Sequence, residues 1–298
     1  MMPPFRRARG MIPSESIFLQ IRGLRYHVRA WGNPEARKIF LLHGWMDVSA
    51  SFQFVVDAMR GDWRILAPDW RGFGLSEWCG VDSYWYPDYL ADLEGLLDAL
   101  QPGEPVNLAG HSMGGNIACI FAGVRPGRIG RLVNLEGLGM RDSSAEDAPK
   151  RYAKWLDDVA RPQQFRGYAS YEDLAARLCE SNGRLDPERA RFLARHWGVL
   201  RDDGRVELRS DPAHKRVNPV LYREQEAMAC LRGITAPVIW VEGELSDLFT
   251  KFKLSREVVA ERRRQIPNCV HRTIMGAGHM LHHDRPEQVA EVLNDFFS

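Results

Sequence analysis

One short stretch constrains the fold of this chain more than any other. An apolar run at 106–109 leads into the segment Gly110–Gly114 (GHSMG), and small and apolar residues follow from Asn116. A serine spaced this way between two glycines, with a strand before it and a helix after it, indicates a sharp turn that exposes the serine hydroxyl. Larger side chains two positions from Ser112 would collide with nearby backbone, so glycine is needed there. We therefore predict a strand–turn–helix unit with Ser112 as a nucleophile.

The rest of the chain alternates between short apolar runs and helical patterns. The runs are mostly continuous rather than alternating, which is typical of strands covered on both faces. They lie at 17–21, 25–30, 39–42, 65–67, 106–109, 132–135, 238–241 and 271–275. Helical spacing or boundary signals mark 86–100, 116–124 and 286–297. This alternation predicts an α/β fold with a mainly parallel sheet flanked by helices.

Residues 139–233 break that rhythm. They are rich in Arg, Asp, Glu and Ala and helical in pattern, and they contain no convincing buried strand. We predict a core domain made of 1–138 and 234–298, in which 1–14 are loose, interrupted by a helical cap or lid at 139–233. The alternative is that 139–233 form a packing subdomain with no role at a site.

A serine hydroxyl needs a base to act as a nucleophile, and nine histidines compete for that role. His279 follows the last predicted strand, and glycines at 276 and 278 leave its loop free to reach back. We predict His279 as the base. His282 and His283 are expected to be capping or surface groups, and His43 is expected to hold its own loop by a hydrogen bond.

A developing oxyanion needs two backbone N–H donors. The first is that of Met113, directly after the nucleophile, at the positive end of the following helix. The segment His43–Trp45 follows an early strand and is placed to supply the second from Trp45. We predict Met113 and Trp45 as the oxyanion hole.

Two carboxylates compete to orient the base. Glu136 ends the apolar run at 132–135, and Asp247 follows the run at 238–241 in a polar loop. Both obey the chain order serine, acid, histidine. A carboxylate at the end of a buried strand is costly unless it has partners, which favours Glu136. Asp247 is kept as the alternative.

With these residues the chain resembles the serine hydrolases of the α/β-hydrolase fold that carry a helical cap, over nearly its whole length. The matching pieces are His43–Trp45, the loop 67–76, the GHSMG segment and Gly278-His279. The segments 41–47 and 135–139 are similar to the serine-hydrolase-like branch. The resemblance implies an α/β-hydrolase fold, an acyl-enzyme mechanism and no cofactor or metal.

The comparison with that family also bears on the acid. Its dehalogenases and epoxide hydrolases attack with Asp, so Ser112 disfavours those chemistries. Some dehalogenases of the fold carry a Glu after the sixth strand, where Glu136 falls. The usual late acid stands three residues after a glycine, and here Gly243 places Ser246 at that position and Asp247 one residue later. The departure weakens Asp247.

Charge and cysteine usage exclude other classes. The chain has 40 Lys+Arg against 39 Asp+Glu, so it has no large net positive charge that would attract nucleic acid or acidic membranes. No apolar run reaches the ~18 residues needed to span a bilayer, and no apolar stretch follows the arginines of residues 1–10, so we expect neither a membrane span nor a signal peptide. Five scattered cysteines without a CxxC pair favour a reducing, cytoplasmic setting over a disulfide frame or a zinc site.

We therefore predict a cytoplasmic enzyme that hydrolyses a carboxylic ester, with a small, neutral and apolar acyl substrate. A lactonase, thioesterase, amidase or C–C bond hydrolase would use the same three residues, since fold and triad do not determine the substrate. A ligand-binding protein on the same scaffold is the non-enzymatic alternative. The sequence does not indicate an oligomeric state.

Overall fold

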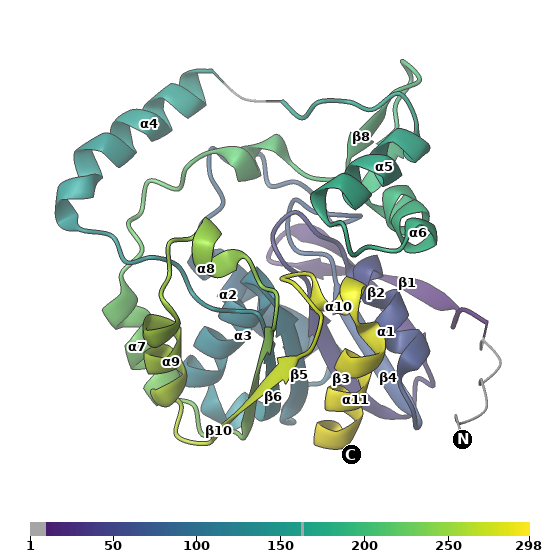
Figure 1. Ribbon diagram of the computed structural model, residues 1–298, viewed down its shortest axis with the longest axis vertical. Coiled ribbons are helices and arrows are strands. Elements are labelled where there is room, and N and C mark those ends of the chain that lie inside the picture. Colours follow the sequence, from purple (N-terminus) through teal and green to yellow (C-terminus); the bar gives the residue numbers. More distant parts are fainter. Residues whose placement is uncertain (1–9, 162–163) are drawn as a thin grey trace.

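An eight-stranded sheet runs through the centre of the protein (Figure 1). The computed structural model describes residues 10–161 and 164–298. Neighbouring strands follow the order β1-β2-β4-β3-β5-β6-β9-β10. Their bounds are β1 Ser14–Ile21, β2 Leu24–Gly32, β3 Arg37–Leu42, β4 Trp63–Pro68, β5 Val106–His111, β6 Ile129–Leu135, β9 Val238–Gly243 and β10 Cys269–Ile274. Each of the eight apolar runs in the sequence corresponds to one of these strands.

The sheet is mainly parallel, as predicted. β2 pairs antiparallel with β1 and β4, and the remaining five pairs of neighbouring strands are parallel. The central strands β3, β5 and β6 are almost completely buried, which explains why their sequences are continuously apolar. Parallel strands end at the same edge of a sheet, so the residues that follow β3, β5, β6 and β9 are brought together.

Helices cover both faces of the sheet. Buried side chains of α2, α3, α7 and α9 pack on one face, and those of α1 and α11 pack on the other (Figure 1). The α-helices that pack on or beside the sheet are α1 Gln53–Ala58, α2 Tyr86–Leu100, α3 Met113–Val124, α7 Glu224–Arg232 (the last helix of the segment 139–233), α8 Leu248–Lys251, α9 Arg256–Arg264, α10 Leu281–Asp284 and α11 Pro286–Phe297. Two of the predicted helices, α2 and α11, have the predicted bounds, and α3 begins three residues earlier, at Met113.

The inserted segment, residues 139–233, carries α4 Ala148–Ala160, α5 Tyr171–Ser181, α6 Pro187–Trp197, β7 Gly198–Leu200 and β8 Val206–Leu208, followed by α7. Its α5, α6 and β8 share a small core that includes Leu174, Leu193 and Val206. The β7–β8 hairpin was not predicted, because each strand has three residues and no apolar run marks it. Helix α7 packs on α3 of the sheet domain, so the end of the inserted segment contacts the core.

The start of the chain is partly described. Residues 1–9 of the predicted loose segment lie outside the described residues. Beyond them the Ile12 N–H donates to Asp57 at 2.8 Å, and β1 already begins at Ser14. Helices in the described part of the chain are all too short or too polar to cross a membrane.

Candidate active site

Ser112 stands at the turn between β5 and α3. Its φ of +51° and ψ of −115° lie outside both helical and extended conformations, which is the strained geometry expected of an exposed nucleophile. The Ser112 N–H donates to the carbonyl of Leu135 at the end of β6, at 2.8 Å. This bond ties the turn to the neighbouring strand β6. The Ser112 carbonyl in turn accepts from the Asn116 N–H in α3 at 2.9 Å.

The glycines around Ser112 are required by close backbone contacts. A Cβ atom on Gly110 would lie 2.4 Å from the Gly114 carbonyl oxygen, and one on Gly114 would lie 2.3 Å from that of Leu42. Real Cβ atoms do not approach backbone this closely. The steric reason given for these glycines from the sequence is therefore confirmed.

The loop His43–Trp45 follows β3 and lies against the nucleophile. A Cβ atom on Gly44 would lie 3.1 Å from the Cβ of Ser112. Among the described residues the Trp45 N–H finds no acceptor, and Met113 opens α3, where N–H groups lack partners within the helix. The loop and the start of α3 thus place free N–H groups beside Ser112, while the Trp45 indole is largely exposed.

His43 holds this loop, as predicted. Its Nε2 accepts from the Trp70 N–H at 2.9 Å, so its Nδ1 carries the proton and donates to the Gly44 carbonyl at 2.8 Å. Complete burial lowers the pKa of His43, which keeps the ring neutral. The ring is therefore a fixed hydrogen-bonding group in the loop.

His279 lies in the loop between β10 and α10. Its carbonyl accepts from His111 Nε2 at 2.9 Å, and the two rings are 4.7 Å apart. Since His111 immediately precedes Ser112, this contact brings the His279 loop to the turn. No hydrogen bond between the Ser112 hydroxyl and His279 is found among the described side chains, and such bonds often tighten only when substrate binds.

Glu136 follows β6 directly and is fully buried. The His279 Nδ1 lies 3.2 Å from its Oε2. The same carboxylate accepts from the Gly243 N–H at 2.6 Å and from the Ser246 hydroxyl at 2.5 Å. Glu136 has a φ of +59°, unusual for a residue with a side chain, and its N–H is held by the Val241 carbonyl. The buried charge is therefore well supplied with donors, as a buried carboxylate requires.

Asp247 does not meet the histidine in the structure. Its side chain is half exposed and forms an ion pair with Lys251 at 2.8 Å, one turn further on. Ser246, one residue earlier, takes the position that faces Glu136. The geometry thus joins Glu136 rather than Asp247 to His279.

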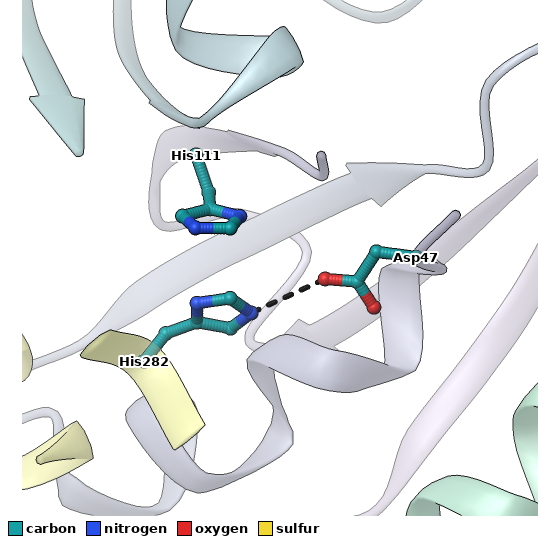
Figure 2. Close-up of side chains that lie close together, drawn as sticks. All are labelled: Asp47, His111 and His282. Atoms are coloured by element: carbon teal, nitrogen blue, oxygen red, sulfur yellow. Dashed lines mark hydrogen bonds and ion pairs between the residues drawn. The ribbon is translucent and has the colours of Figure 1, made fainter. Parts of the chain in front are cut away.

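The expectation that His282 and His283 are capping or surface groups was wrong. Both are buried, in the short helix α10, and His282 Nε2 donates to Asp47 at 3.2 Å. Figure 2 shows the His282 ring lying next to the His111 ring, with a nitrogen at its edge joined to Asp47. The partner Asp47 is 235 residues away in the sequence, so no local pattern signals the burial.

This cluster ties together the two loops of the site. Burial would raise the pKa of Asp47, but the hydrogen bond and the electrostatic attraction of the neighbouring His282 ring outweigh it and lower the pKa to about 2. Asp47 also accepts from the Val48 N–H and the Ser51 hydroxyl, so the charge has several partners. The loop after β3 and the segment after β10 are thereby held against each other.

Among the described residues, Asp47, His111 and His282 form the group whose side-chain atoms could together bind a metal ion. One atom each of Asp47, His111 and His282 lies within 4.8 Å of the others, and all three residues are buried. Two imidazole nitrogens and a carboxylate oxygen suit Zn²⁺ or a similar ion. The hydrogen bond between His282 and Asp47 already engages two of these atoms, so binding an ion would first displace that proton.

Asp284 is a residue of the site that the sequence analysis missed. Its carboxylate accepts from Gly278, next to His279, at 2.8 Å. It also accepts from Asn182 and Arg184 of the inserted segment, both at 2.7 Å. Asp284 therefore connects the inserted segment to the loop that carries His279. An acid just before Arg285-Pro286 resembles an ordinary helix start, so local sequence carries no signal for this role.

The chain is similar in sequence to curated proteins and similar in fold to solved structures. The chain is 28% identical to a serine hydrolase-like protein of Danio rerio over 277 residues, which cover 90% of this chain and 83% of that protein. It is 29% identical to a 3-hydroxybutyrate-oligomer hydrolase of Cupriavidus necator over 291 residues, 92% of each chain. A thioesterase domain from the curacin biosynthetic pathway superposes with a TM-score of 0.84 at 26% identity, covering 94% of this chain and 99% of that one.

These matches confirm the resemblance to serine-hydrolase-like proteins. The model of the alpha/beta hydrolase family matches residues 39–292, from β3 into α11. The match therefore includes every strand that ends at the site and every loop described above. The chain is a hydrolase of this type and belongs to the alpha/beta hydrolase family.

Proposed function

We propose that the protein hydrolyses a carboxylic ester through an acyl-enzyme, with Ser112 as nucleophile, His279 as base and Glu136 as the orienting acid. The observation that carries the proposal is the contact between the buried Glu136 and the partly buried His279, beside a strained, glycine-flanked serine turn. Serine, histidine and carboxylate in this arrangement are the requirements for activating a weak hydroxyl nucleophile.

The reaction follows from the proton positions. Glu136 accepts the Nδ1 proton of His279, which leaves Nε2 free to take the proton of Ser112 as its oxygen attacks the carbonyl carbon. The N–H groups of Met113 and Trp45 bind the oxyanion. His279 then gives the proton to the leaving alcohol as the ester C–O bond breaks. A water molecule, activated by the same base, releases the acid and restores Ser112.

The inserted segment is proposed as a cap that selects an apolar acyl group. Its α4 has Asp158 as its one buried residue and leaves Tyr152 and Leu156 largely exposed. The names of two similar proteins, an oligomer hydrolase for 3-hydroxybutyrate and a thioesterase, support acyl substrates. A thioester is therefore the second candidate for the bond that is cleaved.

Active-site labelling tests the proposal. A fluorophosphonate should label the native protein on Ser112, and Ser112→Ala should abolish both the label and the turnover of p-nitrophenyl esters. A panel of acyl chain lengths, run with matched thioesters, ranks the two bond types. If the folded protein takes up no label and turns over neither panel, the proposal is wrong. Labelling without turnover would favour a ligand-binding protein.

A further inference from the structure

A small pocket lies where the inserted segment meets the sheet domain, and the proposed catalytic residues do not line it. Its volume is about 70 Å³, room for about two water molecules. It is lined by residues of β2, of the loop after β3 (48–50), of the loop after β4 (69–75), of α6 and by the residue after β8. The lining residues are Arg29, Val48, Ser49, Ala50, Asp69, Gly74, Leu75, Arg195, His196 and Arg209.

The pocket concentrates positive charge. Three arginines line it, Arg29, Arg195 and Arg209, and within the described residues none of them lies within ion-pair distance of a carboxylate. The one acid in the lining, Asp69, uses its oxygens on inner donors: His27 Nδ1 at 2.7 Å and the N–H groups of Ser49 and Leu75. Asp69 therefore offsets part of the Arg29 charge from a distance but forms an ion pair with none of the three arginines.

Two buried donors in the lining lack partners. The Nε of Arg29 and the hydroxyl of Ser49 are inaccessible to solvent and form no hydrogen bond among the described residues. Ser49 as a whole is 1% exposed. A buried polar group without a partner costs free energy, so an acceptor that reaches either donor would be stabilised by it.

The remaining contacts are consistent with an anion. Burial first, and then the charge of Arg29, lower the pKa of His196 to about 4, so His196 is neutral and its Nδ1 lies 3.4 Å from Arg29 Nη2. Arg209 is anchored by its Nε to the Gly198 carbonyl at 2.9 Å. Guanidinium groups are the preferred partners of phosphate and carboxylate oxygens.

We propose that this pocket binds a phosphate-sized oxyanion, coordinated by Arg29, Arg195, Arg209 and the Ser49 hydroxyl. Arg29 belongs to the sheet domain, whereas Arg195 and Arg209 belong to the inserted segment. One bound ion therefore joins the two parts through charges that otherwise repel each other. The site is independent of the proposed hydrolase activity.

Calorimetric titration of the full chain with sodium phosphate tests the proposal, with NaCl keeping the ionic strength constant. The wild type should bind one phosphate. Arg195→Glu reverses an exposed charge, so it leaves the fold intact, and it should weaken phosphate binding at least tenfold. Ser49→Ala should weaken binding about threefold to tenfold, the loss of one hydrogen bond.

Arg272→Glu is the matched control. It makes the same change in net charge on β10, at the opposite edge of the sheet from β2, and should bind phosphate as the wild type does. Acetate should bind more weakly than phosphate, and equal binding would overturn the assignment to phosphate. The site itself is refuted if the wild type binds no phosphate, or if Arg195→Glu and Arg272→Glu weaken binding equally.

Discussion

Replacing Glu136 with glutamine tests the proposed acid most directly. The shape of the side chain is kept, but one oxygen becomes an NH₂ donor. The Gly243 N–H donates to Oε1 at 2.6 Å and belongs to the backbone, so it cannot become an acceptor. The amide therefore turns its oxygen to Gly243 and its NH₂ group to Ser246 and His279.

That orientation fixes the wrong tautomer of the base. Facing an NH₂ donor, His279 Nδ1 must accept, so its proton moves to Nε2, the atom that has to take the proton of Ser112. In Ser-His-Asp enzymes an amide in place of the acid lowers kcat by about 10⁴-fold, or about 5 kcal/mol at 1.36 kcal/mol per tenfold. We expect Glu136→Gln to lose about 10³- to 10⁴-fold in kcat and to remain folded.

The assay is the steady-state turnover of a short-chain p-nitrophenyl ester, with the thermal midpoint measured in parallel. Asp247→Asn is the matched control, the same acid-to-amide change on a half-exposed side chain. It should stay within about twofold of the wild type, since surface substitutions have small effects. The reasoning is refuted if Glu136→Gln stays within tenfold of the wild type while Asp247→Asn loses several orders of magnitude.

Three further predictions concern residues around this site. Ser246→Ala removes one donor to the Glu136 carboxylate and should lower kcat/KM about tenfold, whereas Ser246→Thr should restore it; unchanged kinetics in Ser246→Ala would contradict a positioning role. Asp284→Ala breaks the contact with Gly278 and should lower the free energy of unfolding by about 2 kcal/mol and reduce kcat, and urea unfolding measures the first. Burial lowers the pKa of His283 from 6.5 to about 3. Between these pH values the unfolded chain binds a proton that the folded chain does not, so the free energy of unfolding falls as pH drops from 6.5 toward 3. His283→Phe should reduce this pH dependence by up to about 1.4 kcal/mol per pH unit, and an unchanged pH dependence would contradict the prediction.

Much of the sheet domain could be predicted because its signals are local. Each buried strand is a short continuous apolar run, and the serine turn is marked by its own glycines and flanks. The preference for Glu136 over Asp247 also came from a local argument, the cost of a buried carboxylate. The structure places Glu136 in contact with His279.

The remaining features depend on contacts between distant segments. His282 is polar and follows a loop, yet its burial is decided by Asp47, far away in the sequence. Asp284 acquires its role from Arg184 in the inserted segment. The pocket around Arg29 needs arginines that stand more than 160 residues apart in the printed sequence. A local sequence pattern cannot indicate contacts between residues that lie this far apart in the chain.

The placement of Glu136 directly after β6 has a consequence for the order in which the site assembles during folding. The proposed nucleophile and acid end adjacent strands, β5 and β6, within one strand–helix–strand unit. Closing this short connection costs less chain entropy than joining segments that are far apart in the sequence. The proposed base is joined to Glu136 across 143 residues. Any partly folded chain in which only the β5–α3–β6 unit has formed would therefore hold the serine and the acid without the base, and would be chemically inert until β10 docks.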